Sequence, residues 1–217
     1  MKQAELSARE NEKLAQEENN LAKALLRTSN LRIREAKTRL KLYENEIKLA
    51  DERKKVAKEN RKILEHKLRN KDCGVLENCD RPLDSDKELI EYNEKVATLQ
   101  KKIAELYKEI AEVELELADS KKDLAKEVIS FSKKRKSLSK KQLRYLKAFK
   151  SNASMDKINK LETNFTHLQE ELVDDRNTVI KKEKIMKKRE NELAKLSKKL
   201  SEKLLEREKI QHKLDLS

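Results

Sequence analysis

The sequence predicts an all-α fold, an elongated coiled coil of three long helices that pair as antiparallel hairpins. Charged residues make up 44% of the 217 residues and aromatic residues only 3%, which leaves little bulky apolar material for a compact core. Glycine and proline occur once each, so few positions interrupt a helix. Apolar residues recur every seven positions over long stretches, which is typical of helices that pair along a narrow seam.

Intrinsic disorder is the competing interpretation of this composition. A net charge of +13 and few aromatic residues are typical of disordered chains. Such chains are usually rich in proline and glycine and lack a sustained repeat, whereas this chain has the opposite character. Because Lys, Glu, Leu, Ala and Arg dominate instead, we expect folded helices.

The first helix is expected over residues 2–71, a stretch without glycine or proline. Its apolar face is broader than a two-stranded seam requires, which suits a helix that contacts two neighbours. The polar segment 28–30 is a candidate local break. One register contains Leu26, Ile33, Leu40 and Ile47, with Ala36, Tyr43, Ala50, Ala57 and Leu64 in the flanking position, and a further stripe contains Leu42, Leu49, Val56 and Ile63.

A loop is expected over residues 73–85, between an N-terminal unit of residues 1–72 and a hairpin of residues 86–217. Gly74 and Pro82 interrupt the helical pattern there. Ser85 and Glu88 have the spacing of a capping box, in which the serine oxygen accepts a backbone N–H and the glutamate reaches back. The second helix is therefore expected to begin at about residue 86.

Both cysteines, Cys73 and Cys79, lie in this predicted loop. They are either free thiols, a disulfide or intermolecular bridge, or half of a metal site. Zinc needs four ligands, and the nearest histidine, His66, has no second ligand pair to complete a set. Free thiols are the favoured interpretation because the sequence shows no export signal.

The second helix is expected over residues 86–149, with an apolar residue every seven positions from Leu89 to Tyr145 and others three residues after several of them. Such a run predicts a coiled-coil seam. Its predicted pairing residues are Leu89, Val96, Leu99, Ile103, Leu106, Ile110, Leu117, Leu124, Phe131 and Leu138.

The third helix is expected over residues 155–215, after a turn near residues 150–154. Asn152 or Ser154 can cap it, and Asp156 favours its positive end. A break this short favours an antiparallel hairpin. The predicted pairing residues of this helix are Ile158, Leu161, Phe165, Leu168, Leu172, Val179, Met186, Leu193, Leu196 and Leu200.

Both of these seams have polar middle sections, which the hairpin would bring together. Complementary charges within a seam can fix the register and direction of pairing. The alternative is that these side chains are simply solvated. The expected opposite pairs are Lys134 with Asp175, Glu127 with Lys182, and Ala148 with Leu161.

Residues 131–150 carry nine Lys or Arg residues and no acid. Residues 159–178, on the facing helix, carry five acids and two basic residues, so we expect the basic stretch to remain unneutralised. Such a surface binds an acidic protein, an anionic membrane or nucleic acid, or is an ordinary solvated face. The predicted patch is Lys133, Lys134, Arg135, Lys136, Lys140, Lys141, Arg144, Lys147 and Lys150.

Catalytic, cofactor-binding and metal-binding residues are not expected, and neither is a small-molecule substrate. One glycine cannot form a phosphate-binding loop, and His66, His167 and His212 are far apart in the sequence. No stretch approaches 18 consecutive apolar residues, and the N-terminus has no apolar signal region. We therefore expect a cytoplasmic or nuclear protein without a transmembrane segment.

The leading functional hypothesis is a non-enzymatic scaffold that oligomerises through helical seams in a cytoskeletal, centrosomal, kinetochore or chromosome-associated assembly. The alternative is a peripheral membrane-binding module. Three long helices with a basic face resemble the layout of BAR domains, and this resemblance covers the whole chain through helix count and charge. It implies binding to anionic lipids through residues such as Lys133 and Arg135. Nucleic-acid binding is a third possibility.

Overall fold

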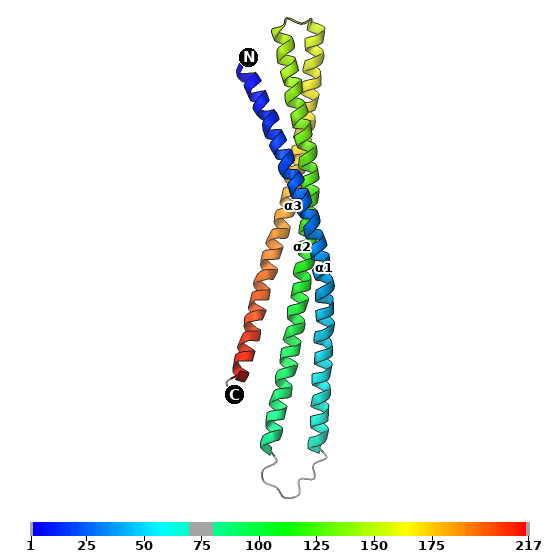
Figure 1. Ribbon diagram of the computed structural model, residues 1–217, viewed down its shortest axis with the longest axis vertical. Coiled ribbons are helices and arrows are strands. Elements are labelled where there is room, and N and C mark those ends of the chain that lie inside the picture. The colour runs from blue at the N-terminus through cyan, green and yellow to red at the C-terminus, as the bar shows by residue number, and fades with distance from the viewer. Residues whose placement is uncertain (1, 70–79, 216–217) are drawn as a thin grey trace. The chain divides into compact units, whose positions relative to one another are not determined.

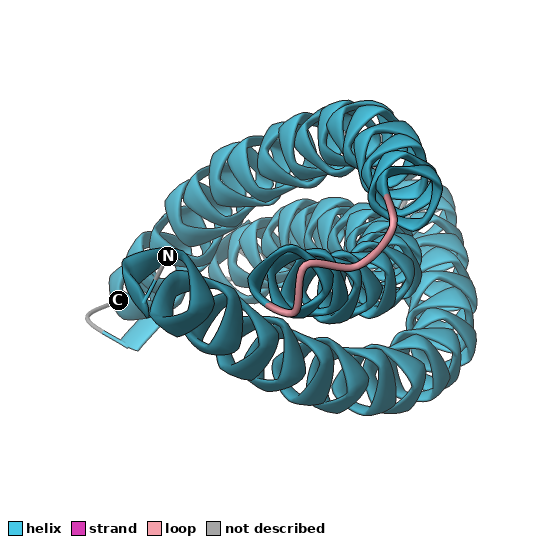
Figure 2. Cartoon of the chain, turned by 90° about the horizontal axis from the view of Figure 1, so that it is seen from above, coloured by secondary structure: helices cyan, strands magenta, loops and turns pink. Residues whose placement is uncertain are grey.

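The protein is all-α throughout the part that the computed structural model describes, which comprises the backbone of residues 2–69 and 80–215 and the side chains of residues 2–66 and 86–212. Three helices follow one another: α1 (Lys2–Arg69), α2 (Asp80–Lys150) and α3 (Met155–Asp215). They are coloured blue to cyan, green, and yellow to red in Figure 1. Within the described ranges no strand occurs, and only residues 151–154, the pink connection in Figure 2, are not helical.

The start of α2 differs from the prediction, because the helix begins at Asp80 rather than near residue 86. Pro82 is tolerated here because the first N–H groups of a helix have no intrahelical partner, so proline loses no hydrogen bond. Ser85 lies inside α2, so the predicted capping box with Glu88 is wrong. The expectations for Gly74 and both cysteines concern positions outside the described residues.

The polar segment 28–30 does not break α1, contrary to the expectation. The hydroxyl of Thr28 donates to the carbonyl oxygen of Leu25 at 3.0 Å, and that of Ser29 donates to the same oxygen at 2.7 Å. Back-bonding of this kind accommodates hydroxyl side chains within a helix.

The connection between α2 and α3 is a Schellman motif followed by a new helix start. Asn152 has a φ of 50°, in the left-handed region that asparagine tolerates better than most residues. The N–H of Ala153 donates to the carbonyl oxygen of Ala148 at 3.1 Å, and the N–H of Asn152 donates to that of Phe149 at 3.3 Å. The carbonyl oxygen of Ser154 accepts from the N–H of Ile158 at 3.1 Å. Asn152 therefore terminates α2 after Lys150, and Ser154 is the N-cap residue of α3.

The tertiary contacts divide the chain into two compact units. The first contains residues 1–34 and 114–191, and the second contains residues 35–113 and 192–217. Each unit is thus built from parts of all three helices, and each is described separately below.

Small side chains at seven-residue intervals form the buried contact surface of α1 and α2. Such side chains permit a short distance between helix axes. Ser132 and Ser139 are buried with their hydroxyls bonded to the carbonyl oxygens of Ile129 and Arg135, each at 3.1 Å. In the first unit the buried series are Ala8, Ala15, Ala22 and Ser29 on α1, and Ala118, Ala125, Ser132 and Ser139 on α2.

The second unit continues both series, with two large residues, Tyr43 and Leu64, on α1. Tyr43 takes the α1 position between Ala36 and Ala50, and its ring stacks on Tyr107 of α2 with centroids 5.1 Å apart and planes at 11°. The buried members of the two series in this unit are Ala36, Ala50, Ala57 and Leu64 on α1, and Ala97, Ala104 and Ala111 on α2.

The larger residues of the predicted seams are buried to different extents. Leu89 is 49% exposed, near the start of α2. No described residue of α3 after Leu172 is fully buried. The buried members are Leu99, Ile103, Leu117, Leu124, Ile158, Leu168 and Leu172. The half-buried members are Val96, Leu106, Ile110, Phe131, Leu138, Leu161, Phe165, Val179, Met186, Leu193, Leu196 and Leu200.

A larger side chain at position 125 is expected to destabilise the fold. Ala125 is fully buried, so Ala125→Leu should force α1 and α2 apart and lower the free energy of unfolding by about 1–3 kcal/mol. Urea denaturation followed by circular dichroism measures the change. The matched control is Ala194→Leu, at an exposed position of α3, which should change stability little. Equal losses in both variants would contradict the close contact.

Candidate interaction surfaces

The predicted basic patch lies on α2 in the first unit, and most of its cations already have acceptors within that unit. Six of the nine form a hydrogen bond or an ion pair with α1 or α3: Lys134, Arg135, Lys136, Lys140, Lys141 and Lys150. The other three, Lys133, Arg144 and Lys147, are exposed.

The acceptors on α1 are spaced along its first five turns. The Nζ of Lys150 lies 2.6 Å from the Oε1 of Glu5, and the Nη1 of Arg135 lies 2.7 Å from the Oε1 of Glu18. Arg135 also donates to Asn11 at 3.1 Å. The hydrogen bond from Lys150 lowers the pKa of the Glu5 carboxyl below its ordinary value of 4.5.

Further contacts from α1 engage the middle of the patch. The Nζ of Lys136 donates to the Oε1 of Gln16 at 2.7 Å, and the Nζ of Lys140 lies 3.8 Å from the Oε1 of Glu12. Because partner numbers on α1 rise as those on α2 fall, the two segments run in opposite directions in this unit.

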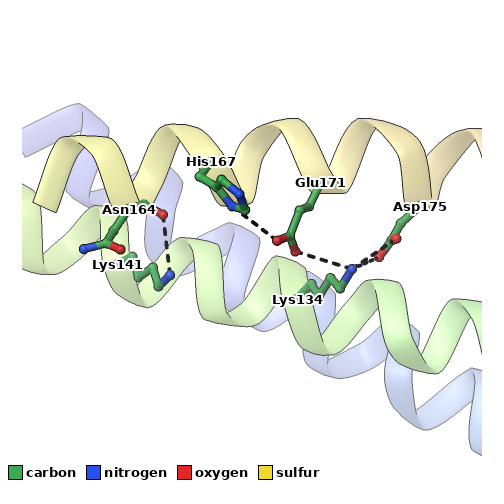
Figure 3. A network of polar contacts seen from close by, with 6 residues as sticks. All are labelled: Lys134, Lys141, Asn164, His167, Glu171 and Asp175. Carbon is green, nitrogen blue, oxygen red and sulfur yellow. Dashed lines mark hydrogen bonds and ion pairs between the residues drawn. The ribbon is translucent and has the colours of Figure 1, made fainter. Parts of the chain in front are cut away.

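The acceptors on α3 surround Lys134, as Figure 3 shows. Its Nζ lies 3.0 Å from the Oδ2 of Asp175 and 3.5 Å from the Oε2 of Glu171. The hydrogen bond to Asp175 is the main reason why the pKa of Lys134 is raised above its ordinary value. Lys141 donates to the carbonyl oxygen of Asn164 at 3.4 Å.

This basic stretch is therefore partly neutralised, to an extent that the sequence-based expectation did not include. That expectation considered only the acids of the third helix, whereas residues 5–18 of α1 supply five further acids against two basic residues. Four of the nine patch cations are paired with carboxylates of α1 or α3. The patch is mainly a contact surface within the first unit.

One expected pair of opposite charges between α2 and α3 is confirmed, whereas Lys182 of the second expected pair has a different partner. Lys134 pairs with Asp175 as predicted. Lys182, however, lies 3.8 Å from Asp123, one helical turn from the expected Glu127. Two further pairs join these helices in the first unit: Lys121 with Glu190 at 3.0 Å, and Arg189 with Glu116 at 2.7 Å. The pairing of Ala148 with Leu161 stays a prediction.

An exposed cationic face on α3 was missed by the sequence analysis. Lys181, Lys184 and Lys188 are exposed and share one face because they are three and four residues apart, and Lys187 is exposed beside them. Within the described residues, none of these four lysines has an ion pair. Ile180 and Ile185, 38% and 51% exposed, lie among them. The spacing of three and four residues between these lysines is the feature of the sequence that could have predicted this face.

The hollows in the second unit are open grooves between helices. One, of about 540 Å³, contains both acidic and basic side chains, including Arg61, Glu94, Lys102 and Glu206. Two others, of about 390 Å³ each, are lined by α1 and α2, including alanine side chains, and Arg207 of α3 also lines one of them.

Among the described residues, no group of three or more His, Cys, Asp or Glu side chains could hold a metal ion. The Nδ1 of His167 lies 3.2 Å from Glu171, on the same helix. A helix long and apolar enough to cross a membrane is not found in the described part of the chain.

No protein-family model matches the sequence, and no curated protein matches it either.

The contacts of Lys134 predict a position-specific effect of charge reversal. Lys134→Glu places a carboxylate beside Asp175 and Glu171, so it should lower the free energy of unfolding by about 1–2 kcal/mol in urea denaturation. Adding Asp175→Lys should restore part of the loss. The control Lys133→Glu makes the same charge change at an exposed neighbour without an ion pair among the described residues. A loss as large in this control would refute the role of Lys134.

Proposed function

We propose that this protein is a non-enzymatic coiled-coil scaffold whose helices pair as antiparallel hairpins and which spaces or links components of a larger assembly. The observation that carries the proposal is the seven-residue repeat of small buried side chains on α1 and α2, present in both units. Long helices that pack along such a repeat bury one narrow face each, and their remaining faces stay accessible to partners. Cytoskeletal, centrosomal, kinetochore or chromosomal assemblies are the proposed settings.

Two further features support a role in binding rather than catalysis. Catalysis usually takes place in a concave pocket that excludes water. The grooves of the second unit instead lie open along helix flanks. Several large apolar side chains, such as Leu42, Leu49 and Val56, are more than half exposed, which is typical of a surface that contacts another molecule.

The scaffold proposal predicts a helical oligomer. Circular dichroism of the full chain should show a spectrum dominated by helix, and light scattering should give a mass of at least twice 25.5 kDa. Dilution separates a specific oligomer from aggregation, because a specific oligomer dissociates to a defined smaller species. A monomer with little helix would refute the proposal.

Peripheral membrane binding is a second candidate function, and the exposed face of α3 favours it. Lysines that surround exposed isoleucines can attract anionic headgroups while the apolar side chains enter the interface. The supporting residues are Lys181, Lys184 and Lys188 with Ile180 and Ile185. Most cations of residues 131–150 have acceptors within the first unit, so α3 is the better candidate surface.

Co-sedimentation with vesicles that contain anionic phospholipid tests this second function. The change of Lys181, Lys184 and Lys188 to Glu should abolish binding. The matched control changes Lys133, Arg144 and Lys147, which are exposed on α2, to Glu. Retention of binding in the control and loss in the α3 variant would support the α3 face. No sedimentation of the unaltered chain at low salt would exclude membrane binding.

A further inference from the structure

A stripe of exposed apolar residues runs along α1 in the second unit. It consists of Leu42, Leu49, Val56 and Ile63, which are 53% to 54% exposed and spaced by seven residues. Residues at this spacing lie nearly above one another on one face of a helix. The buried contact with α2 uses a different face, which contains Ala50 and Ala57 directly after two stripe residues. Within the described part of the second unit, the stripe therefore remains uncovered.

The stripe borders the two grooves that α1 and α2 line, one of which also has Arg207 of α3 in its lining. Leu49 lines one of them together with Ala50 and Ala104, and Val56 lines the other together with Ala57 and Ala97. Each groove has a volume of about 390 Å³. Apolar side chains from a partner could enter these grooves while they cover the stripe.

The spacing and the neighbouring charges limit what can cover this stripe. A seven-residue apolar repeat matches another helix that lies along it with the same repeat. Exposed Glu52 and Glu59 alternate with exposed Lys48 and Lys55 beside the stripe, so this edge offers a partner both signs of charge and not the purely cationic surface that an anionic membrane or nucleic acid favours. The partner is therefore a helix with an apolar stripe and flanks of mixed charge.

We propose that the occupant is a second copy of this chain, whose α1 stripe packs antiparallel on the first. This inference rests on the proposed scaffold function and specifies its oligomer contact. A two-fold symmetric contact requires a surface that is complementary to itself. The charges along one edge of the stripe meet this requirement, because Lys48 and Lys55 alternate there with Glu52 and Glu59.

The antiparallel register follows from interleaving the two stripes. Lys48 and Lys55 precede stripe residues by one position, and Glu52 and Glu59 follow stripe residues by three, so all four share one edge. When Leu49 lies between Val56 and Ile63 of the other copy, Lys48 comes nearly level with that copy's Glu59. Lys55 then comes nearly level with that copy's Glu52. Symmetry gives each of these attractive pairs twice.

A parallel pair would have less favourable charges. In a parallel pair in register, the residue before one stripe position faces the residue four after the same position of the other copy. Lys48 would then face Arg53 of that copy, and Lys55 would face Asn60. Only Lys41 would meet an acid, at Glu46. The flanking charges therefore favour the antiparallel arrangement.

The first experiment measures mass by sedimentation velocity over a range of concentrations. Leu49→Asp with Val56→Asp places charges in the stripe at positions that are already exposed, so the helices should still form, as circular dichroism can verify. Association should weaken about 100-fold or more. The matched control, Val173→Asp with Leu205→Asp, alters residues that are 57% and 56% exposed on α3 and should leave association unchanged.

A charge exchange tests the partner contacts. Lys48→Glu with Lys55→Glu should weaken self-association, and so should Glu52→Lys with Glu59→Lys. An equimolar mixture of these two variants should restore the dimer, because each then supplies the charges that the other needs. No recovery in the mixture would overturn the proposed register.

Spin labels distinguish the two directions of pairing, in a chain with Cys73→Ser and Cys79→Ser. For Leu42→Cys alone, the antiparallel dimer should hold the two labels about 35 Å apart at 1.5 Å per residue. A label at position 42 of one copy and at position 63 of the other should be close together. Two labels at position 42 that lie close together, with labels at positions 42 and 63 far apart, would overturn the antiparallel arrangement.

The outcomes separate this inference from the scaffold proposal. An oligomer whose mass is unaffected by the paired Leu49 and Val56 substitutions would overturn the stripe as the contact and leave the scaffold proposal standing. A helical monomer at all concentrations would overturn both self-association and the oligomerisation on which the scaffold proposal depends. A dimer that dissociates only in the stripe variant would support the inference.

Discussion

The close contact of α1 with α2 through small side chains is the constraint on which the other features depend. Alanine or serine occupies almost every seventh position on both helices, and these positions are buried. A strip this narrow buries little apolar area for each residue, so it must extend along the helices to be stable. Because the buried strip is narrow, most of the surface of each helix can carry charged side chains. This explains how a chain with 44% charged residues can fold.

The distribution of charge follows from this packing. When two helices approach closely, the long side chains at the edges of the contact reach across to the neighbouring helix. In the first unit, Arg135 and Lys150 on α2 therefore meet Glu18 and Glu5 on α1. Most cations of the densest basic segment consequently make contacts within the protein, and a separate exposed cationic face lies on α3.

Much of the fold could be predicted from the sequence because seven-residue periodicity and the lack of breakers are local signals. The bounds of α3 and the pair between Lys134 and Asp175 were predictable in this way. The start of α2 was not, because Pro82 can either end a loop or occupy a first helical turn. The partial neutralisation of residues 131–150 by α1 was also missed. It depends on which part of α1 lies beside them, and periodicity does not give the pairing of distant segments.

Two serines in the small-residue series have a consequence for chemical modification. The side chains of Ser132 and Ser139 are buried and bonded to backbone carbonyls, so a kinase cannot reach their hydroxyls while α1 and α2 remain in contact. A phosphoryl group there would be too large and too highly charged for the space. Ser130 and Ser137 are exposed in the same stretch. Phosphorylation of neighbouring serines would therefore have different structural costs, depending on which face of one helix carries the hydroxyl.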